Sequence, residues 1–450
     1  MTKKSLENLI NEHGSAVEAL RNSTYPAAEF PVKPEFTNWR SEQAAWRTTC
    51  ALLDQSHHMD DLFLSGPDAL RLLSEHSVNS YANFPRGSAK QFIVTNTQGY
   101  MIGDAILFHM EEGEYDVVCN PSVINWLLFN IEIGDYDVNI FRCPNSNRRE
   151  GPPKLYRYEV QGPNAQALME KVTGSEIPRL KFFHMNELTI AGHHVWGLRH
   201  GMAGQPGYEL FGPWEQGEDV LNAILAAGDE FGLIRAGGKA YSTANLESGW
   251  VPKPPVTAIF GDEEKAYREW LPASAIGSLG GSLVSDDITD YYITPYDISY
   301  GRMVKFDHEF KGRAALEKIA ANPPRRKVTL VWNVDDVTAA IRTQYEPGLP
   351  AKSIEMPKAR LGFFQADMVL KDGKQVGISM DCGYIHNERA MVSLATLNNE
   401  VAEGDEVVIL WGESPNSKKP GIEPHRQVEI RAMVAPCPYS QEARDSYRKA

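Results

Sequence analysis

Glu209, in the stretch 201–250, is the first residue whose type and position could support chemistry. A turn rich in glycine and proline, Gly204-Gln-Pro-Gly207, precedes it, and the alternating residues that follow predict a short strand. The neighbours of Glu209 are largely apolar, and a carboxylate in apolar surroundings is costly to bury unless donors reach it. Glu209 therefore either meets hydrogen-bond donors inside the protein or forms an ordinary salt bridge at the surface.

Tyr241 is the second candidate for chemistry. It precedes Leu246-Glu-Ser-Gly249 in a helical segment and has glycine and small polar residues around it, at 237–238 and 242–243. A phenol, with an ordinary pKa near 10, is suited to exchanging a proton with another oxygen of similar basicity. A hydrogen-bonded core tyrosine or a surface tyrosine is the alternative.

Four further polar residues are open to more than one interpretation. His57 and His58 are adjacent, so their side chains diverge on a strand and on a helix, and we predict no metal site there. His58 is either a loop histidine or a contact to substrate. Asp104 lies in a predicted strand, and Asn120 is a good N-cap before Pro121, so neither needs a functional explanation.

Composition narrows the class of protein. The chain has 450 residues with 42% hydrophobic and 23% charged residues, as is common for globular enzymes. Its net charge of −14 argues against a nucleic-acid partner. Five scattered cysteines without a CxxC pair, no export signal and no long apolar run favour a cytoplasmic protein that does not enter the membrane. Nucleotide-binding glycine loops, HExxH and GxSxG are all missing.

The middle of the chain alternates short predicted strands with helices. A hairpin is expected over 92–108, followed by a third strand at 115–119. A pattern of strand, Gly-Pro-x-Ala and helix occurs twice, at Ser65–Ala69 and at Gln161–Ala165. This repetition indicates a duplicated α+β unit and not a βαβ arrangement.

The N-terminal and C-terminal parts of the chain differ in their predicted secondary structure. Helices are expected over 4–22 and from Trp39 toward Leu53, and the segment 321–326, with two consecutive prolines, is the clearest linker. Short strands are expected after it, at 327–332, 368–370, 374–378, 390–397 and 406–411. We therefore predict an α+β region over 1–320 and an all-β C-terminal domain over 327–450.

Seven motifs in a fixed order now suggest a family. They are Asp54-Gln-Ser-x-His-Met, Ser65-Gly-Pro-Asp-Ala, Asn96-x-x-Gly-x-x-x-Gly-Asp, Gly207-Tyr-Glu-Leu, Leu246-Glu-x-Gly, Thr294-Pro-Tyr-Asp and Phe310-Lys-Gly-x-x-Ala-Leu. Together they resemble the glycine cleavage T-protein (aminomethyltransferase) superfamily. Within it, the chain is most similar to tetrahydrofolate-dependent aryl O-demethylases of the vanillate/3-O-methylgallate and syringate type. The resemblance implies a three-domain cloverleaf around a central folate channel, with an all-β C-terminal domain.

The resemblance also implies roles for individual residues. Cofactor binding falls to Glu209, which would pair with the pterin, and to Trp250, Tyr208 and Asp104. Catalysis falls to Tyr241 and His58, and substrate binding to Gln55, His58 and Asn120. The cofactor is tetrahydrofolate, with no metal, and the partner is a small methoxylated aromatic molecule.

Two departures from the family patterns qualify the expected substrate. The glycine-cleavage proteins have two arginines in the run that here reads Tyr241–Glu247 and an acid pair where this chain has Gly103-Asp104, which makes an aminomethyl-lipoyl substrate doubtful. The vanillate enzymes have an arginine where this chain has Asn120. A neutral amide cannot form a bidentate charged pair, so a neutral methoxyphenol, or a carboxylate held by another arginine, fits better.

We therefore predict methyl transfer from an aryl methyl ether to N5 of tetrahydrofolate, with Tyr241 as the acid. One alternative is a folate-dependent demethylase of a sulfonium or N-methyl substrate, for which Trp39, Tyr208 and Tyr241 could form a cage. A second alternative is a folate-binding regulator without catalysis. The oligomeric state is left open.

Overall fold

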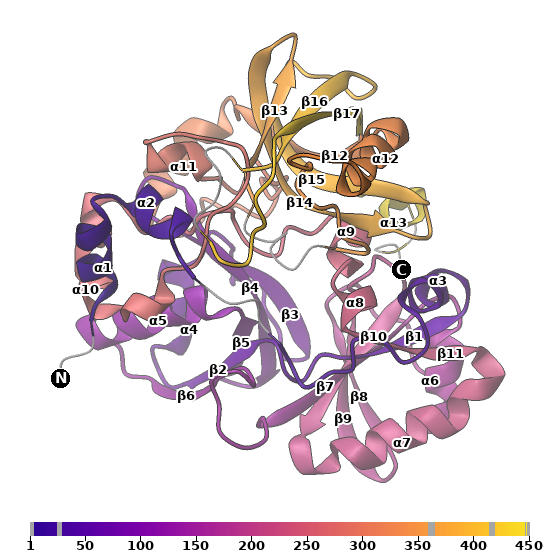
Figure 1. Cartoon of the computed structure of the whole chain (residues 1–450). Helices are drawn as coiled ribbons and strands as arrows, with labels where there is room; N and C mark the ends of the chain where they lie inside the picture. Colours follow the sequence, from indigo (N-terminus) through magenta and orange to yellow (C-terminus); the bar gives the residue numbers. More distant parts are fainter. Residues whose placement is uncertain (1–3, 25–28, 359–364, 414–418, 446, 448–450) are drawn as a thin grey trace.

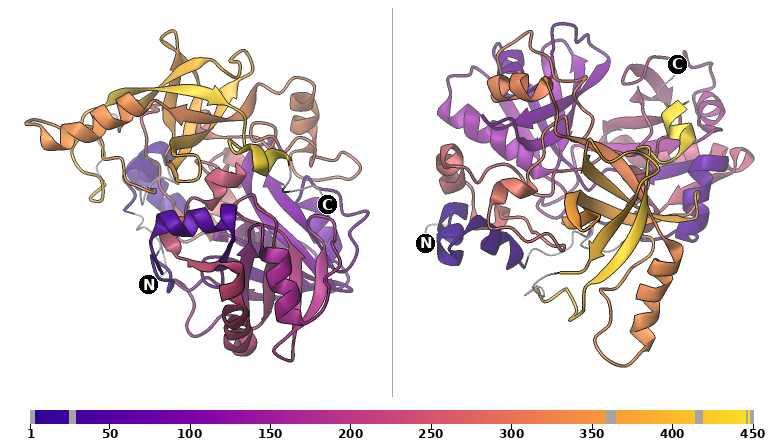
Figure 2. Two further views of the ribbon diagram at one scale, coloured as in Figure 1. Left: turned by 90° about the vertical axis from the view of Figure 1, so that its right-hand side faces the viewer. Right: turned by 90° about the horizontal axis from the view of Figure 1, so that it is seen from above.

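The α+β fold contains two open sheets and a closed barrel (Figure 1). This computed structural model describes the chain except for residues 1–3, 25–28, 359–364, 414–418, 446 and 448–450. In Figures 1 and 2 the two sheets lie side by side, and the barrel rests across one end of them. The predicted fold class, α+β with an all-β C-terminal part, is confirmed.

The first sheet is entirely antiparallel, with the strand order β3-β4-β5-β2-β6. Its strands are β2 (Asp60–Ser65), β3 (Ser88–Thr95), β4 (Met101–Glu111), β5 (Glu114–Cys119) and β6 (Asn139–Cys143). Apolar residues of β2 and β5 pack against helices α4 (Ala69–Glu75) and α5 (Pro121–Ile133). The predicted hairpin is confirmed, because β3 and β4 pair in antiparallel orientation. In the turn between them, Asn96 Oδ1 accepts hydrogen bonds from the backbone N–H groups of Gln98 and Tyr100.

The second sheet has the order β11-β1-β7-β10-β9-β8, in which only β1 and β11 pair in parallel. Its strands are β1 (Cys50–Asp54), β7 (Leu155–Gln161), β8 (Met185–Ile190), β9 (His193–Arg199), β10 (Gly207–Pro213) and β11 (Leu233–Ala236). Its helices are α3 (Trp39–Thr48), α6 (Ala165–Thr173), α7 (Gly217–Gly228), α8 (Gly238–Tyr241) and α9 (Ala244–Ser248). The helix predicted from Trp39 toward Leu53 is too long, because its apolar end is strand β1.

The two sheets repeat one unit, as the Gly-Pro pattern predicted. Each unit runs strand, helix, three antiparallel strands and helix: β2-α4-β3-β4-β5-α5 in the first, and β7-α6-β8-β9-β10-α7 in the second. Gly66 and Gly162 end the first strands with φ of 116° and 134°. In both, a Cβ would lie within 2.7 Å of a backbone oxygen, so only glycine fits.

The barrel follows the second unit after a region with few regular elements. It closes in the order β12-β15-β14-β13-β16-β17 around a core that includes Trp332 and Trp411. Its strands are β12 (Arg325–Trp332), β13 (Asp367–Lys371), β14 (Lys374–Ile385), β15 (Ala390–Asn398), β16 (Glu406–Trp411) and β17 (Val428–Ala435), and α12 (Val334–Arg342) and α13 (Gln441–Asp445) accompany it. The five predicted strands lie within it, and β17 was missed. The ends of the predicted domain ranges, 1–3 and 448–450, lie outside the described residues.

The helix predicted over 4–22 is two helices. Gly14, with φ of 82°, ends α1 (Leu6–His13), and Ser15 caps α2 (Ala16–Arg21). Of the remaining helices, α10 (Lys265–Trp270) contacts α1, and α11 (Arg313–Ala320) precedes the barrel.

Candidate active site

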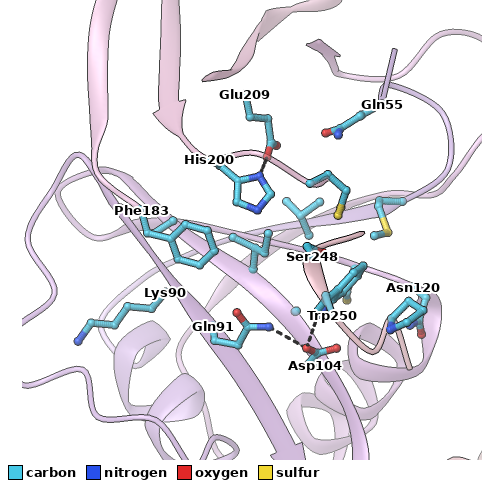
Figure 3. Close-up of a pocket in the computed structure, with 18 of the residues that line it drawn as sticks. Gln55, Lys90, Gln91, Asp104, Asn120, Phe183, His200, Glu209, Ser248 and Trp250 are labelled. Atoms are coloured by element: carbon cyan, nitrogen blue, oxygen red, sulfur yellow. Dashed lines mark hydrogen bonds and ion pairs between the residues drawn. The ribbon is translucent and has the colours of Figure 1, made fainter. Parts of the chain in front are cut away.

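A cavity of about 370 Å³ lies between the two sheets. Its walls come from the turn after β1, from β3, β4, β7 and β10, and from the segments around His200 and Trp250. Among the described residues no barrel strand lines the cavity, although Tyr447 near the C-terminus does. Figure 3 shows Glu209, His200 and Gln55 at one end of the cavity and Asp104, Gln91 and Trp250 at the other.

Tyr241 and His58 meet in the wall of this cavity. Tyr241 is the last residue of α8, and its Oη lies 2.9 Å from Nε2 of His58, which stands in the turn after β1. The His58 ring also hydrogen-bonds the Gln55 backbone, an interaction that assigns the proton to Nδ1 and leaves Nε2 as an acceptor. The Tyr241 hydroxyl therefore donates to His58 when no substrate is bound.

Burial keeps both groups uncharged. Desolvation lowers the pKa of His58 to about 4, so its ring is neutral at neutral pH. Desolvation also raises the pKa of Tyr241 well above its ordinary value, and the nearby carboxylates of Glu159 and Glu209 add to this effect. Tyr241 is thus a protonated phenol that can donate a hydrogen bond or a proton to an oxygen in the cavity.

Glu209 is buried and meets donors, so the surface salt bridge considered from the sequence is excluded. Its Oε1 accepts from Arg157 at 3.1 Å, and its Oε2 lies 3.8 Å from Nδ1 of His200. Arg157 also binds Asp61 at 2.7 Å and Asp116 at 2.6 Å, which tethers strands of both sheets to one guanidinium. Burial raises the pKa of Glu209, and the Arg157 charge opposes that shift.

Glu159 lies beside Glu209, across the β7–β10 pairing. It is fully buried, and its Oε1 accepts a hydrogen bond from the Met202 backbone N–H at 2.6 Å. Its Oε2 accepts from the side-chain amide of Gln55. Desolvation raises the pKa of Glu159 to about 8. One carboxyl group therefore holds two elements of the cavity wall, the turn after β1 and the loop before β10.

Asp104 on β4 is the acid at the other end of the cavity. Its Oδ2 accepts from Gln91 Nε2 at 2.7 Å, from Trp250 Nε1 at 3.2 Å and from Tyr300 Oη at 3.2 Å. Its Oδ1 is buried, and no described residue donates to it. Burial raises the pKa of Asp104 to about 6, against the effect of these neutral donors. Oδ1 is therefore an acceptor available to a ligand.

Asn120 is both an N-cap and a residue of the cavity wall, the two alternatives that the sequence left open. Its Oδ1 accepts from the backbone N–H of Ser122 at 3.2 Å, as an N-cap of α5 does, and from the Ser122 hydroxyl at 2.6 Å. The same residue lines the cavity. Because the cap occupies the oxygen, Asn120 offers a ligand chiefly its N–H donors.

Tyr208 does not belong to this site. It precedes Glu209 on β10, so its side chain lies on the opposite face of the sheet, where it packs in the core with Leu210 and donates to Gln166. Trp39 packs against Tyr384 and His386 and is likewise absent from the cavity wall. Tyr208, expected to bind the cofactor, therefore lies outside the cavity that Glu209 lines, and Trp39, Tyr208 and Tyr241 do not form an aromatic cage there.

Arg157 in the cavity wall, and Glu159, which holds the lining residue Gln55, were not predicted from the sequence. A signal for them exists, because Arg157, Glu159 and Gln161 alternate with Tyr156, Tyr158 and Val160 along β7, and one face of the strand is polar. That pattern is also typical of a solvent-exposed face, and only the second sheet covering it makes the face part of a site. Gln91, Lys90 and His200 gave no comparable signal.

Neither a metal-binding cluster nor a membrane-spanning helix occurs in the described part of the chain. No group of three or more histidine, cysteine or acidic side chains there is arranged to hold a metal ion. No helix there is long and apolar enough to cross a membrane.

The comparisons with known proteins agree with the fold. Residues 8–252 match the family model for the GCVT N-terminal domain, and the chain belongs to this family. In structure, the chain is similar to the glycine cleavage system aminomethyltransferase T from Bartonella henselae, with a TM-score of 0.61 and 18% identity over 92% of this chain and 95% of that one. This likeness concerns the fold alone.

Three curated relatives are similar in sequence. A syringate O-demethylase from Sphingobium sp. is 44% identical over 99% of this chain and 98% of its own length. A sesamin methylene transferase from Sinomonas sp. is 28% identical over 94% of both chains. An aminomethyltransferase from Streptomyces coelicolor is 29% identical over 65% of this chain and 70% of its own.

Proposed function

We propose that this protein is a tetrahydrofolate-dependent O-demethylase that transfers the methyl group of a methoxylated aromatic compound to N5 of tetrahydrofolate. The observation that carries the proposal is the 44% identity, over 99% of the chain, to a syringate O-demethylase. Membership of the GCVT N-terminal domain family supports tetrahydrofolate as the acceptor. The methoxy C–O bond breaks and an N–C bond forms, and the proton lost from N5 balances the proton gained by the phenol.

The chemistry of the cavity fits tetrahydrofolate. The pterin ring presents an N–H and an amino group side by side, and a buried carboxylate such as Glu209 is an acceptor for such a pair. Trp250 offers an aromatic surface, and Asp104 offers the unoccupied acceptor Oδ1. These three residues would hold the cofactor, which supplies the nitrogen that accepts the methyl group.

Tyr241 is the residue we propose for the leaving oxygen. An ether oxygen leaves poorly as a free phenolate, and a phenol of similar basicity can share a proton with it as charge develops. Rotation of the Tyr241 hydroxyl away from His58 would direct its proton to the ether oxygen, while His58 and Gln55 orient the ring. Asn120 contributes N–H donors and no charge, so neutral and carboxylated rings both need to be tested.

The direct test is to incubate the protein with tetrahydrofolate and a panel of compounds, and to measure 5-methyltetrahydrofolate. The panel holds neutral methoxyphenols and methoxybenzoates, including the syringate named in the Sphingobium relative. We expect product from at least one methoxylated ring. Tetrahydrofolate that binds without product from any ring would contradict the proposal and favour a sulfonium or N-methyl donor, or a regulator.

A second experiment isolates the role of Tyr241. The substitution Tyr241→Phe removes only the hydroxyl, and we expect kcat to fall by about 100-fold while tetrahydrofolate binding is unchanged. Unchanged kcat in this variant would exclude Tyr241 as the acid and leave the overall reaction in place.

A further inference from the structure

Glu159 is a buried titratable group that the proposed chemistry does not use. It contacts no solvent, and it holds the Met202 backbone N–H through Oε1 and the Gln55 amide through Oε2. Gln55 lines the cavity in the turn that also carries His58. Glu159 therefore acts on the cavity through Gln55.

The contact decides which end of the Gln55 amide faces the cavity. A glutamine amide has a donor end, Nε2, and an acceptor end, Oε1. Because Nε2 donates to Glu159, the Oε1 end is left for the cavity, and no described residue donates to it. An acceptor beside Tyr241 and His58 recognises a donor on the aromatic ring.

We propose that Glu159 determines substrate specificity, because it orients Gln55 as an acceptor and so selects aromatic rings that carry a free hydroxyl beside the methoxy group. The inference rests on the proposed O-demethylation and narrows its substrate class. A ring hydroxyl donates to Gln55 Oε1, and this bond sets the neighbouring methoxy oxygen toward Tyr241. A ring in which that hydroxyl is methylated leaves Oε1 facing the cavity without a donor, a loss of about tenfold in kcat/KM.

The proton on Glu159 controls this orientation. The ionised carboxylate accepts from both Met202 and Gln55, whereas a protonated Oε2 would donate to Gln55 Oε1 and turn the amide N–H groups toward the cavity. The charged and titratable groups around Glu159 are Glu209 on β10, Tyr241 on α8 with His58 behind it, and Arg157 further along β7. Burial, together with the Glu209 charge, raises the pKa of Glu159 to about 8. Selectivity for the hydroxylated ring is thus expected to rise as the pH increases through 8.

The experiment compares two small rings, 2-methoxyphenol and 1,2-dimethoxybenzene, by the ratio of their initial kcat/KM values with tetrahydrofolate. For the natural protein we expect a ratio of about tenfold or more at pH 9 and a smaller ratio at pH 7. In Glu159→Gln the new amide still accepts from Met202 and donates to Gln55 Oε1, which turns the Gln55 N–H groups toward the cavity. We expect this variant to lose the preference and its pH dependence.

Gln161→Met is the matched control. Gln161 lies on the same face of β7 and accepts from the Ala203 backbone N–H of the same loop at 2.9 Å, but it does not contact Gln55. Its substitution should leave the ratio unchanged. If Glu159→Gln fails to fold, the pH dependence of the natural protein remains the test.

The outcomes separate the two proposals. Equal turnover of both rings by the natural protein would overturn the specificity inference and leave O-demethylation standing. A Glu159→Gln variant that keeps the natural ratio and only raises the KM for tetrahydrofolate would also overturn the specificity inference alone, since Gln55 would then contact the cofactor. No turnover of any methoxylated ring would overturn the function, and the inference with it.

Discussion

The two repeated units share a backbone plan and differ in the charges at equivalent positions. The residue five positions before the glycine that ends the first strand is Asp61 in the first unit and Arg157 in the second. The residue three positions before that glycine pairs with Asp116 on β5 in the first unit and with Glu209 on β10 in the second. Arg157 binds all three acids. The repeated units thus place charged residues at matching positions. Because one of these positions holds an acid in the first unit and an arginine in the second, the interface between the units contains an ion-pair cluster.

A second difference lies at the position that pairs with these two acids. The position three residues before the glycine is Phe63 in the first unit and Glu159 in the second. Phe63 packs near Phe141 of the neighbouring strand β6, beneath the Lys154 ammonium. Glu159 is buried against the cavity wall. The same backbone therefore supports a half-buried aromatic contact in one unit and a buried acid, which holds the lining residue Gln55, in the other.

The strongest test of this comparison removes the shared cation. Arg157→Met leaves Asp116 and Glu209 buried without their charge partner, and we expect the free energy of unfolding to fall by about 4 kcal/mol. Urea unfolding measures the change. Arg86→Met, which breaks exposed pairs with Glu111 and Glu187, is the control and should cost less than about 1 kcal/mol. Equal losses would show that the interface does not depend on Arg157.

The next test concerns Asp104, an acid of the first unit that has only neutral hydrogen-bond donors. Its pKa, raised to about 6 by burial, means that the folded protein holds this proton to a higher pH than the unfolded chain does. The contribution of Asp104 to stability is therefore greatest below pH 4 and is lost as the pH rises to 6, by at most about 3 kcal/mol. Asp104→Asn does not titrate, so its stability relative to the natural protein should increase over this range. Urea unfolding of both proteins at pH 4.5 and pH 7 measures this increase. A stability difference between them that is the same at both pH values would contradict the prediction.

A smaller effect tests the equivalence of the two turns. Gly66→Ala and Gly162→Ala each place a methyl group against a backbone oxygen, that of Asp137 or of Thr49, at a φ that other residues rarely adopt. We expect each to cost about 2 kcal/mol, and the two costs to be similar. Gly174→Ala, where the methyl group meets open space, should cost about 1 kcal/mol. Thermal or urea unfolding measures all three, and a clear inequality between the first two would argue against equivalent turns.

The smallest expected effect separates binding from structure at a pair of equivalent acids. Glu209→Gln should weaken tetrahydrofolate binding by about tenfold, since the neutral amide loses the charged acceptor that faces the cavity. Asp116→Asn changes the matching acid, which does not line the cavity, and should lower stability while leaving the Kd unchanged. Isothermal titration gives both Kd values. Equal Kd changes would mean that the cluster acts as one unit.

Much of the fold was predictable from local pattern. The hairpin from β3 to β4, the Asn120 cap and the repeated Gly-Pro turns follow from residues whose conformational preferences act within a few positions. Errors occurred where tertiary packing overrides such preferences. The residues 50–53 continue an apolar helical pattern, yet they form β1 because β7 and β11 pair on both sides of it.

The sequence by itself determined the duplicated architecture, the barrel and most candidate residues, because glycine turns, strand alternation and ordered motifs act locally. Only the tertiary structure decided which side chains share a cavity. It separated Tyr208 from its neighbour Glu209, because successive strand residues point to opposite faces. It also joined Tyr241 to His58 and Gln55 to Glu159, pairs more than 100 residues apart. Such contacts depend on how two sheets pack, and no short stretch of sequence encodes that packing.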